Sequence, residues 1–128
     1  MIQRMTIPGR LPGLNEYTRA CRAHPMAGAK MKREAQDAVL WCARAARLRP
    51  HGGPVRVRYQ FFEDPARKGA RLRDKSNIAS FAVKVIEDAL VEAGLIPDDG
   101  WDEVAGYSCE FARTADPRIV VTIEDGLA

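Results

Sequence analysis

Histidine and cysteine are scarce in this chain of 128 residues, which limits the sites it can build. The cysteines, Cys21, Cys42 and Cys109, are odd in number and far apart, so they suit neither a disulfide framework nor the paired ligands of a zinc site. The only histidines are His24 and His51, whereas a Ser-His-Asp triad or a histidine metal site needs several converging groups. The sequence therefore argues against disulfide-stabilised, zinc-binding and histidine-dependent hydrolytic proteins.

Long apolar runs are also missing. No stretch approaches the roughly 20 apolar residues of a membrane-spanning helix. Arg4 and Pro8 interrupt the early hydrophobic residues, which argues against a signal peptide. The chain has no internal repeat, low-complexity tract or linker, and its length suits one compact domain. We therefore expect a single domain over residues 1–128, in the cytoplasm and with no membrane partner.

The net charge of +3 conceals an uneven distribution. Residues 1–75 contain 17 of the 20 lysines and arginines but 6 of the 17 acidic residues, whereas residues 76–128 are strongly acidic. Such asymmetry within one domain favours a basic surface for a polyanion and leaves room for a separate acidic site. Two complementary halves that pack together would explain the same distribution.

Hydrophobic periodicity predicts four strands and two helices. Apolar residues that alternate with polar ones predict strands at residues 1–7, 55–62, about 104–112 and about 118–124. Spacings of three and four residues predict helices at 27–48 and about 76–93, the second of which Gly94 would close.

The connections complete this fold prediction. Residues 14–25 are polar and basic without a clear period, which predicts a loop, and the short segment between the last two strands predicts a hairpin. The order strand-helix-strand-helix-strand-strand predicts an α/β (α+β) fold, with a mixed sheet of about four strands and two helices on one face.

Acidic residues flank the second predicted helix. Asp74 stands at its start within a basic segment, and Asp98 and Asp99 follow its end. Helix capping would explain Asp74, and Asp-Gly dipeptides favour turns, so both positions have structural explanations. Lys84 has a similar one, because Asp88 at i+4 would form an ordinary surface ion pair. The alternative is a metal-dependent nuclease, in which acids bind the ion and bases bind phosphate.

Four segments together resemble the RusA family of Holliday-junction resolvases, in particular its phage and prophage branch. They are residues 7–20, 27–35, 73–101 and 116–124, and they follow one another in the order of the family. The resemblance implies a Mg²⁺-dependent endonuclease, with Mn²⁺ as an alternative ion. It also implies a homodimer that acts on four-way junction DNA and makes paired, symmetric cuts.

The resemblance further implies the roles of individual residues. Asp74 and Asn77 correspond to the acidic motif of the family at the start of the helix, Asp99 with Asp98 to its acidic turn, and Lys84 to its functional lysine. The implied metal ligands are Asp74, Asp98 and Asp99, and the implied catalytic set is Asp74, Ser76, Lys84 and Asp99.

Ser76 departs from the family, which has an acidic residue at this position. A neutral hydroxyl binds Mg²⁺ less well than a carboxylate, so we expect reduced activity. Three interpretations remain open: catalysis survives on the other acids with water filling the gap, the protein binds junctions without cutting them efficiently, or the serine is an engineered change.

Basic residues near Asp74 and in the first quarter of the chain are the expected DNA contacts. The full set is Arg67, Lys68, Arg71, Arg73, Lys75, Asn77, Asn15, Tyr17, Arg19, Lys30 and Lys32. A solvated basic loop would explain the charges beside Asp74 without any DNA. Three functions therefore compete: a junction resolvase, a DNA-binding protein that has lost catalysis, and a nuclease with the same metal site but no preference for junctions.

Overall fold

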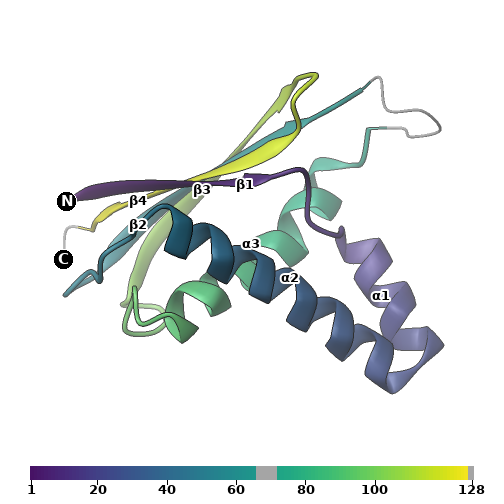
Figure 1. Ribbon diagram of the computed structural model, residues 1–128, viewed down its shortest axis with the longest axis horizontal. Helices are drawn as coiled ribbons and strands as arrows, with labels where there is room; N and C mark the ends of the chain where they lie inside the picture. The colour runs from purple at the N-terminus through teal and green to yellow at the C-terminus, as the bar shows by residue number, and fades with distance from the viewer. Residues whose placement is uncertain (66–71, 127–128) are drawn as a thin grey trace.

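A four-stranded mixed sheet forms one layer of the protein (Figure 1). The computed structural model describes residues 1–65 and 72–126, so the predicted DNA contacts Arg67, Lys68 and Arg71 lie outside the described residues. The strands are β1 (Ile2–Pro8), β2 (Val55–Glu63), β3 (Val104–Arg113) and β4 (Arg118–Asp125). Their order is β1-β4-β2-β3, with β4 antiparallel to both neighbours and β3 parallel to β2. The prediction of a mixed four-stranded sheet is confirmed.

The predicted hairpin of the last two strands is wrong. β4 inserts between β1 and β2, and β3 pairs on the far side of β2. Burial explains this choice, because half of the residues of β4 are buried whereas β3 has only exposed and half-buried residues. The apolar strand takes the interior position, and the more polar strand takes the edge.

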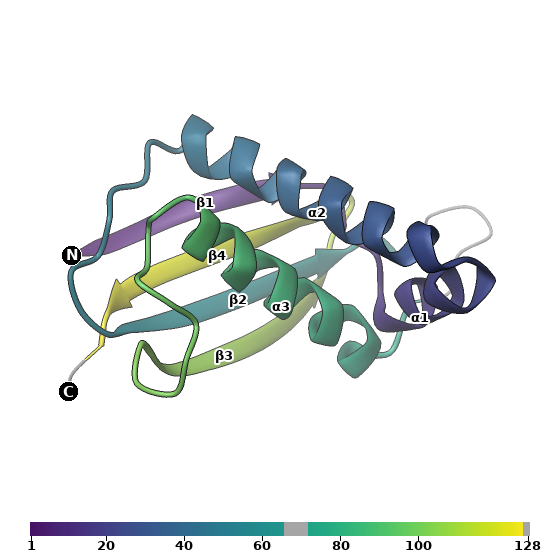
Figure 2. The same ribbon diagram turned by 90° about the horizontal axis from the view of Figure 1, so that it is seen from below.

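The helices are α1 (Leu14–Ala23), α2 (Pro25–Ala45) and α3 (Lys75–Glu92). Helices α2 and α3 run across one face of the sheet, α1 packs against them beyond one end of it, and in the described part of the chain no helix covers the other face (Figures 1 and 2). The two predicted helices are confirmed with slightly shifted ends. Gly94 follows α3 with φ 71°, a left-handed conformation that favours glycine and closes the helix.

Helix α1 corrects the prediction of a loop over residues 14–25. Its apolar positions Leu14, Tyr17 and Cys21 have helical spacing, but the segment is short, mostly polar and buries no residue fully, so this spacing is a weak signal beside that of a core helix. The Tyr17 ring nevertheless packs 4.7 Å from the Phe81 ring of α3, measured between centroids. Tertiary contacts with α2 and α3 therefore stabilise this short polar helix.

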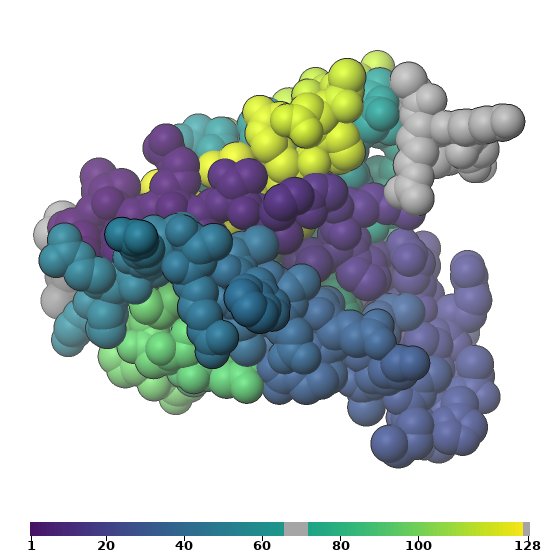
Figure 3. Space-filling model, viewed as in Figure 1, coloured from purple at the N-terminus to yellow at the C-terminus, as the bar shows by residue number. Residues whose placement is uncertain are grey.

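The core lies between the sheet and helices α2 and α3. Val57, Tyr59 and Phe61 of β2 point into it and are at most 2% exposed, and Val85 and Leu90 of α3 are equally buried. The space-filling view shows the helical layer packed against the sheet, without a deep cleft on the side in view (Figure 3). In the described part of the chain, no helix is both long and apolar enough to cross a membrane.

Candidate functional site

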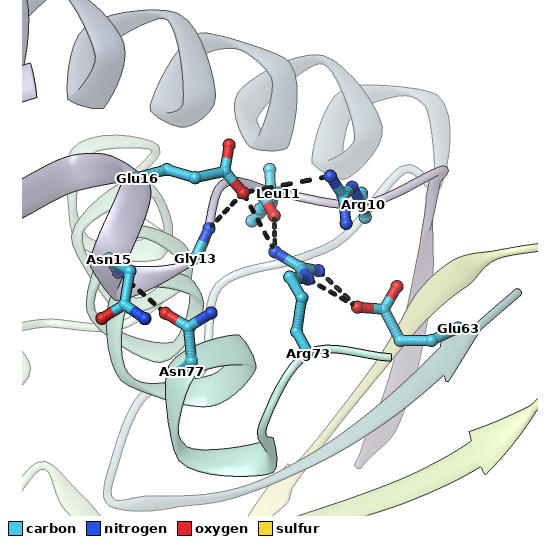
Figure 4. A network of polar contacts seen from close by, with 8 residues as sticks. All are labelled: Arg10, Leu11, Gly13, Asn15, Glu16, Glu63, Arg73 and Asn77. Carbon is cyan, nitrogen blue, oxygen red and sulfur yellow. Dashed lines mark hydrogen bonds and ion pairs between the residues drawn. The ribbon is translucent and has the colours of Figure 1, made fainter. Parts of the chain in front are cut away.

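Arg73 fixes the entrance to α3 through a network of polar contacts (Figure 4). Its Nε donates to Glu63 Oε1 at 3.0 Å, its Nη2 also contacts that oxygen, and its Nη1 donates to the Leu11 carbonyl at 2.9 Å. Glu16 Oε1 lies 3.7 Å from Arg73 Nη1 and 3.9 Å from Arg10 Nη2. The Arg73 side chain is only 11% exposed, so its guanidinium joins the end of β2 to the segment before α1.

Asn77 joins the first turns of α1 and α3 (Figure 4). Its Oδ1 accepts a hydrogen bond of 2.8 Å from the Asn15 backbone N–H. Gly13 packs so closely that an added Cβ would lie 2.8 Å from Asn77 Nδ2. The amide of Asn77 therefore positions the helix start on which Asp74 and Ser76 lie.

The Asp74 carboxylate is free of protein partners within the described residues. Asp74 is the N-cap of α3 and its carbonyl accepts from the Ile78 N–H at 3.0 Å, but its side chain makes no capping hydrogen bond. It lies in an open hollow of about 610 Å³ that Lys75, Ser76 and Arg113 also line. The partial positive charge of a helix N-terminus favours anions here, whether carboxylate or phosphate.

Lys84 and Asp99 form a second charged group. Lys84 Nζ lies 2.7 Å from Asp99 Oδ2 and 3.1 Å from Asp88 Oδ1, and Asp88 also contacts Lys32 Nζ at 2.9 Å. The Asp99 backbone N–H donates to Asp98 Oδ1 at 2.8 Å. These contacts raise the pKa of Lys84 through hydrogen bonds to Asp99 and Asp88, and the bond from Lys84 lowers the pKa of Asp99. Lys84 is therefore a cation and Asp99 an anion at neutral pH.

The two groups are separated along α3. Lys84 follows Asp74 by ten residues, which corresponds to about 15 Å of rise along the helix axis. In the described part of the chain, no three His, Cys, Asp or Glu side chains are arranged to hold a metal ion. The carboxylates have the oxygen chemistry that Mg²⁺ prefers, but one chain does not gather Asp74, Asp98 and Asp99 around one point.

The family model for the endodeoxyribonuclease RusA matches residues 12–124. This chain belongs to the RusA endodeoxyribonuclease family. No curated protein matches it significantly. The matched range contains both charged groups and all of the Arg73 network except Arg10 and Leu11, which come just before it. The family is one of endonucleases that resolve Holliday junctions.

Other residues expected to contact DNA in this RusA-family chain have varied surroundings. Lys30 is 77% exposed and lies 3.8 Å from Glu34, whereas Lys32 is partly exposed and bound to Asp88. Asn15 and Arg19 are exposed on α1. Tyr17 is half-buried against Phe81, and a hydrogen bond with Cys21 raises its pKa.

Sequence reasoning missed Glu87, a buried acid beside the Lys84 group. The Tyr59 hydroxyl donates to Glu87 Oε2 at 2.8 Å, and Glu87 is 8% exposed. Burial raises its pKa, with Asp99 adding a smaller effect in the same direction. The sequence did contain a signal for a buried acid. Glu87 stands three residues before Leu90, on the apolar face of α3, where an acidic residue is unusual.

Proposed function

We propose that this RusA-family protein is a metal-dependent endonuclease that cuts four-way DNA junctions symmetrically in two opposed strands. The match of the endodeoxyribonuclease family model over residues 12–124 carries the proposal. The proposal further includes a single domain over residues 1–128, a homodimer, and membership of the phage and prophage branch. Such a nuclease would serve DNA recombination and repair.

Asp74 and Asp99, assisted by Asp98, are the proposed ligands of Mg²⁺ or Mn²⁺. The chemistry of their oxygen donors supports this role. Their separation along α3 means that the described part of one chain does not form a complete site. Ser76, exposed in the first turn of α3, would add at most a neutral oxygen.

Lys84 is the proposed contact to the phosphate that is cut. Its ammonium group is charged and held by Asp88 and Asp99, yet its side chain is 62% exposed. A positioned cation of this kind stabilises the charge that develops on a phosphate oxygen during cleavage. Arg73 and Asn77 support the proposed site indirectly, because their protein contacts hold the start of α3.

The proposed DNA-binding surface extends from the start of α3 to α1 and α2. Lys75 is exposed beside Asp74, while Arg19 and Lys30 are exposed on the other two helices. Arg67, Lys68 and Arg71 would add charge next to Lys75 in the sequence. Each phosphate neutralised on duplex DNA contributes about −0.9 to the slope of log K against log salt, so binding should weaken steeply with salt.

A junction-binding protein with weak or no catalysis is the second candidate. Two points favour it: Ser76 stands where the resemblance to the family implies an acid, and the described part of a single chain gathers no three-acid metal cluster. A nuclease with the same chemistry but no junction preference would differ only in substrate.

A gel cleavage assay separates these functions. The substrates are a labelled synthetic four-way junction, the matching linear duplex and a single strand, each with and without Mg²⁺. Paired, Mg²⁺-dependent cuts in the junction alone are the expected result. Equal cutting of linear DNA would indicate a nuclease without junction preference. Tight junction binding without cuts would favour the second candidate.

A further inference from the structure

One face of the sheet carries no helix in the described part of the chain (Figures 1 and 2). Along β2, Arg56 and Arg58 are exposed on this bare face, whereas Val57 and Tyr59 are buried on the helical side. Sheets with antiparallel pairs commonly leave one face to water, so exposure alone has no functional meaning. The charge of the bare face is the feature that requires an explanation.

Three arginines line a depression of about 460 Å³ on the bare face. Arg4 of β1 and Arg58 of β2 both pair with Thr122 of β4, which lies between them, so their Cα atoms are about 10 Å apart. Arg56 lies two residues before Arg58 in the same strand, about 7 Å away. The sheet therefore presents three guanidinium groups to one small area of its surface.

Two of these three charges are not neutralised within the described residues. Arg58 is held by Glu110, with Nε donating to Oε1 at 2.7 Å and Nη2 to Oε2 at 2.8 Å. Arg4 donates only to the Thr122 hydroxyl, at 3.3 Å, and the Arg56 side chain makes no ion pair or hydrogen bond there. Like charges on neighbouring strands destabilise a sheet, so an anionic ligand would relieve a repulsion within the fold.

Gly106 of β3 makes room for the Arg56 guanidinium. The two residues pair across the strands, and a Cβ added to Gly106 would lie 2.6 Å from Arg56 Nη1. Glycine weakens the interior of a strand and often marks a site of close approach. The guanidinium thus lies close to the backbone of β3, and its N–H donors remain available to a ligand.

Further arginines connect the depression with the hollow beside Asp74. Arg113, at the end of β3, lines that hollow. Arg118 pairs with Phe62 of β2, and its guanidinium carbon lies 4.1 Å from the centre of the Phe62 ring. Phe62 follows Arg56 by six residues, which corresponds to about 20 Å of strand or about six base pairs of duplex. The arginines therefore form a track over the sheet from the hollow to the depression.

We propose that the bare face binds the phosphodiester backbone of a DNA duplex arm, with Arg4 and Arg56 contacting phosphates in the depression. Arginine suits this ligand because its planar guanidinium donates paired hydrogen bonds to phosphate oxygens. DNA is the polyanion on which a RusA-family endonuclease acts, so the identity of the ligand rests on the proposed function. The contact lies on the opposite side of the sheet from α2 and adds to the DNA contacts proposed on the helices.

The salt dependence of binding tests the two arginines that lack an acidic partner. Fluorescence anisotropy measures the affinity for a labelled four-way junction at several salt concentrations, with EDTA present to prevent cleavage. Arg4→Ala, Arg56→Ala should reduce the slope of log K against log salt by about 1.8, because each lost phosphate contact removes about 0.9. Arg4→Lys, Arg56→Lys retains both charges and should retain most of the slope. An unchanged slope in the alanine variant would overturn the proposal.

A matched control removes the same charge from another surface. Arg44 and Arg47 are exposed near the end of α2 and belong to none of the proposed DNA contacts. Arg44→Ala, Arg47→Ala should leave the slope unchanged, and thermal unfolding should show that every variant is folded. An equal loss of slope in the two alanine variants would show that net charge governs binding, and this would contradict a contact on the bare face.

Glu124 provides a variant that should bind DNA more tightly. It is the one carboxylate among the described residues that line the depression, and it pairs with Arg56 across the strands without forming an ion pair with it. Glu124→Gln should strengthen junction binding several-fold, because it removes a repulsion with phosphate. Asp37→Asn, which removes an exposed carboxylate from α2, should change the affinity less. Equal effects of the two variants would count against the depression as a phosphate site.

Backbone neutralisation maps the contact on the DNA. Uncharged methylphosphonates replace phosphates about five to ten base pairs from the crossover in one junction, and at the ends of long arms in another. The first substitution should weaken binding by the wild type but not by Arg4→Ala, Arg56→Ala, which has already lost that contact. The second should affect neither protein. The same loss in wild type and variant would place the arm elsewhere and exclude the proposed contact.

Cleavage kinetics separate this contact from the proposed function. With Mg²⁺, Arg4→Ala, Arg56→Ala should raise KM for the junction and leave kcat unchanged, because a contact remote from the cut binds substrate and transition state equally. If the wild type binds junctions through the bare face but cuts none, the proposed function fails and the contact stands. If the wild type cuts and the variant binds and cuts equally well, the contact fails and the proposed function stands.

Discussion

Lys84 Nζ donates a hydrogen bond of 2.7 Å to Asp99 Oδ2, although fifteen residues separate them in the sequence. The chain completes α3 and turns back before Asp99 reaches the middle of the helix. Asp88 holds the same ammonium from within the helix at 3.1 Å. Lys84 is consequently positioned by two carboxylates while most of its side chain remains open to solvent.

Lys84→Met should lower junction cleavage by about 100-fold, the effect of losing one positioned charge at a reacting centre. Its free energy of unfolding should change by less than about 1 kcal/mol, because exposed ion pairs contribute little. Cleavage rates and urea unfolding measure the two quantities. Arg33→Met, which breaks the exposed ion pairs of Arg33 with Asp37 of α2 and Glu92 of α3, should keep full cleavage. A Lys84→Met variant that cuts junctions as fast as the wild type would show that Lys84 has no role in cleavage.

Ser76→Asp should raise the Mg²⁺-dependent cleavage rate, because it places a carboxylate beside Asp74 in the first turn of α3. Ser76→Asn supplies a neutral side chain of the same size and is the control. An acid near a helix N-terminus also stabilises by about 0.3–1 kcal/mol, so thermal unfolding should accompany the assay. An unchanged or lower rate would count against Ser76 as the cause of a weakened site.

Arg73→Ala should destabilise the protein by about 3 kcal/mol or more, because it leaves Glu63 without its ionic partner in a largely buried environment. The double variant Arg73→Ala, Glu63→Gln should recover part of that loss, since the uncompensated carboxylate is gone. Urea unfolding measures both. Equal loss in the single and double variants would show that packing and the bond to the Leu11 carbonyl dominate.

Gly13→Ala should destabilise the protein by about 1 kcal/mol, the typical value of one hydrogen bond. The added Cβ would lie 2.8 Å from Asn77 Nδ2, so the amide must move away from the Asn15 N–H. Gly53→Ala is the matched control, because no atom lies within 4 Å of its added Cβ. Similar stability changes in the two variants would show that the Asn77 contact contributes little.

Glu87 should make stability depend on pH. Burial raises its pKa in the folded state, so its contribution is fully present below the pKa of the unfolded chain and is lost as pH rises through the folded value. Glu87→Gln, which can still accept from the Tyr59 hydroxyl, should therefore gain stability over the wild type as pH rises. Urea unfolding across this pH range measures the difference. A gap that stays constant with pH would show that Glu87 does not titrate abnormally.

The extent to which sequence predicted this structure differs between elements. The strong alternation of β2 and the apolar face of α3 identified the core, because each pattern belongs to a segment that buries one face by itself. Helix α1 was not predicted because its ten residues are mostly polar, although Leu14, Tyr17 and Cys21 have helical spacing. The position of β4 between β1 and β2 was not predicted either, because strand pairing depends on which distant segments compete for the interior of the sheet.

The sequence by itself determined the α/β class, the uneven distribution of charge along the chain and the RusA family, because periodicity, charge and motifs are local properties of the chain. Tertiary structure alone decided that Arg73 and Asn77 hold the start of α3, that Lys84 meets Asp99, and that Asp74 stands apart from both. Those relationships depend on how α3 packs and where the chain returns beside it. No local pattern encodes the distance between side chains that folding brings together.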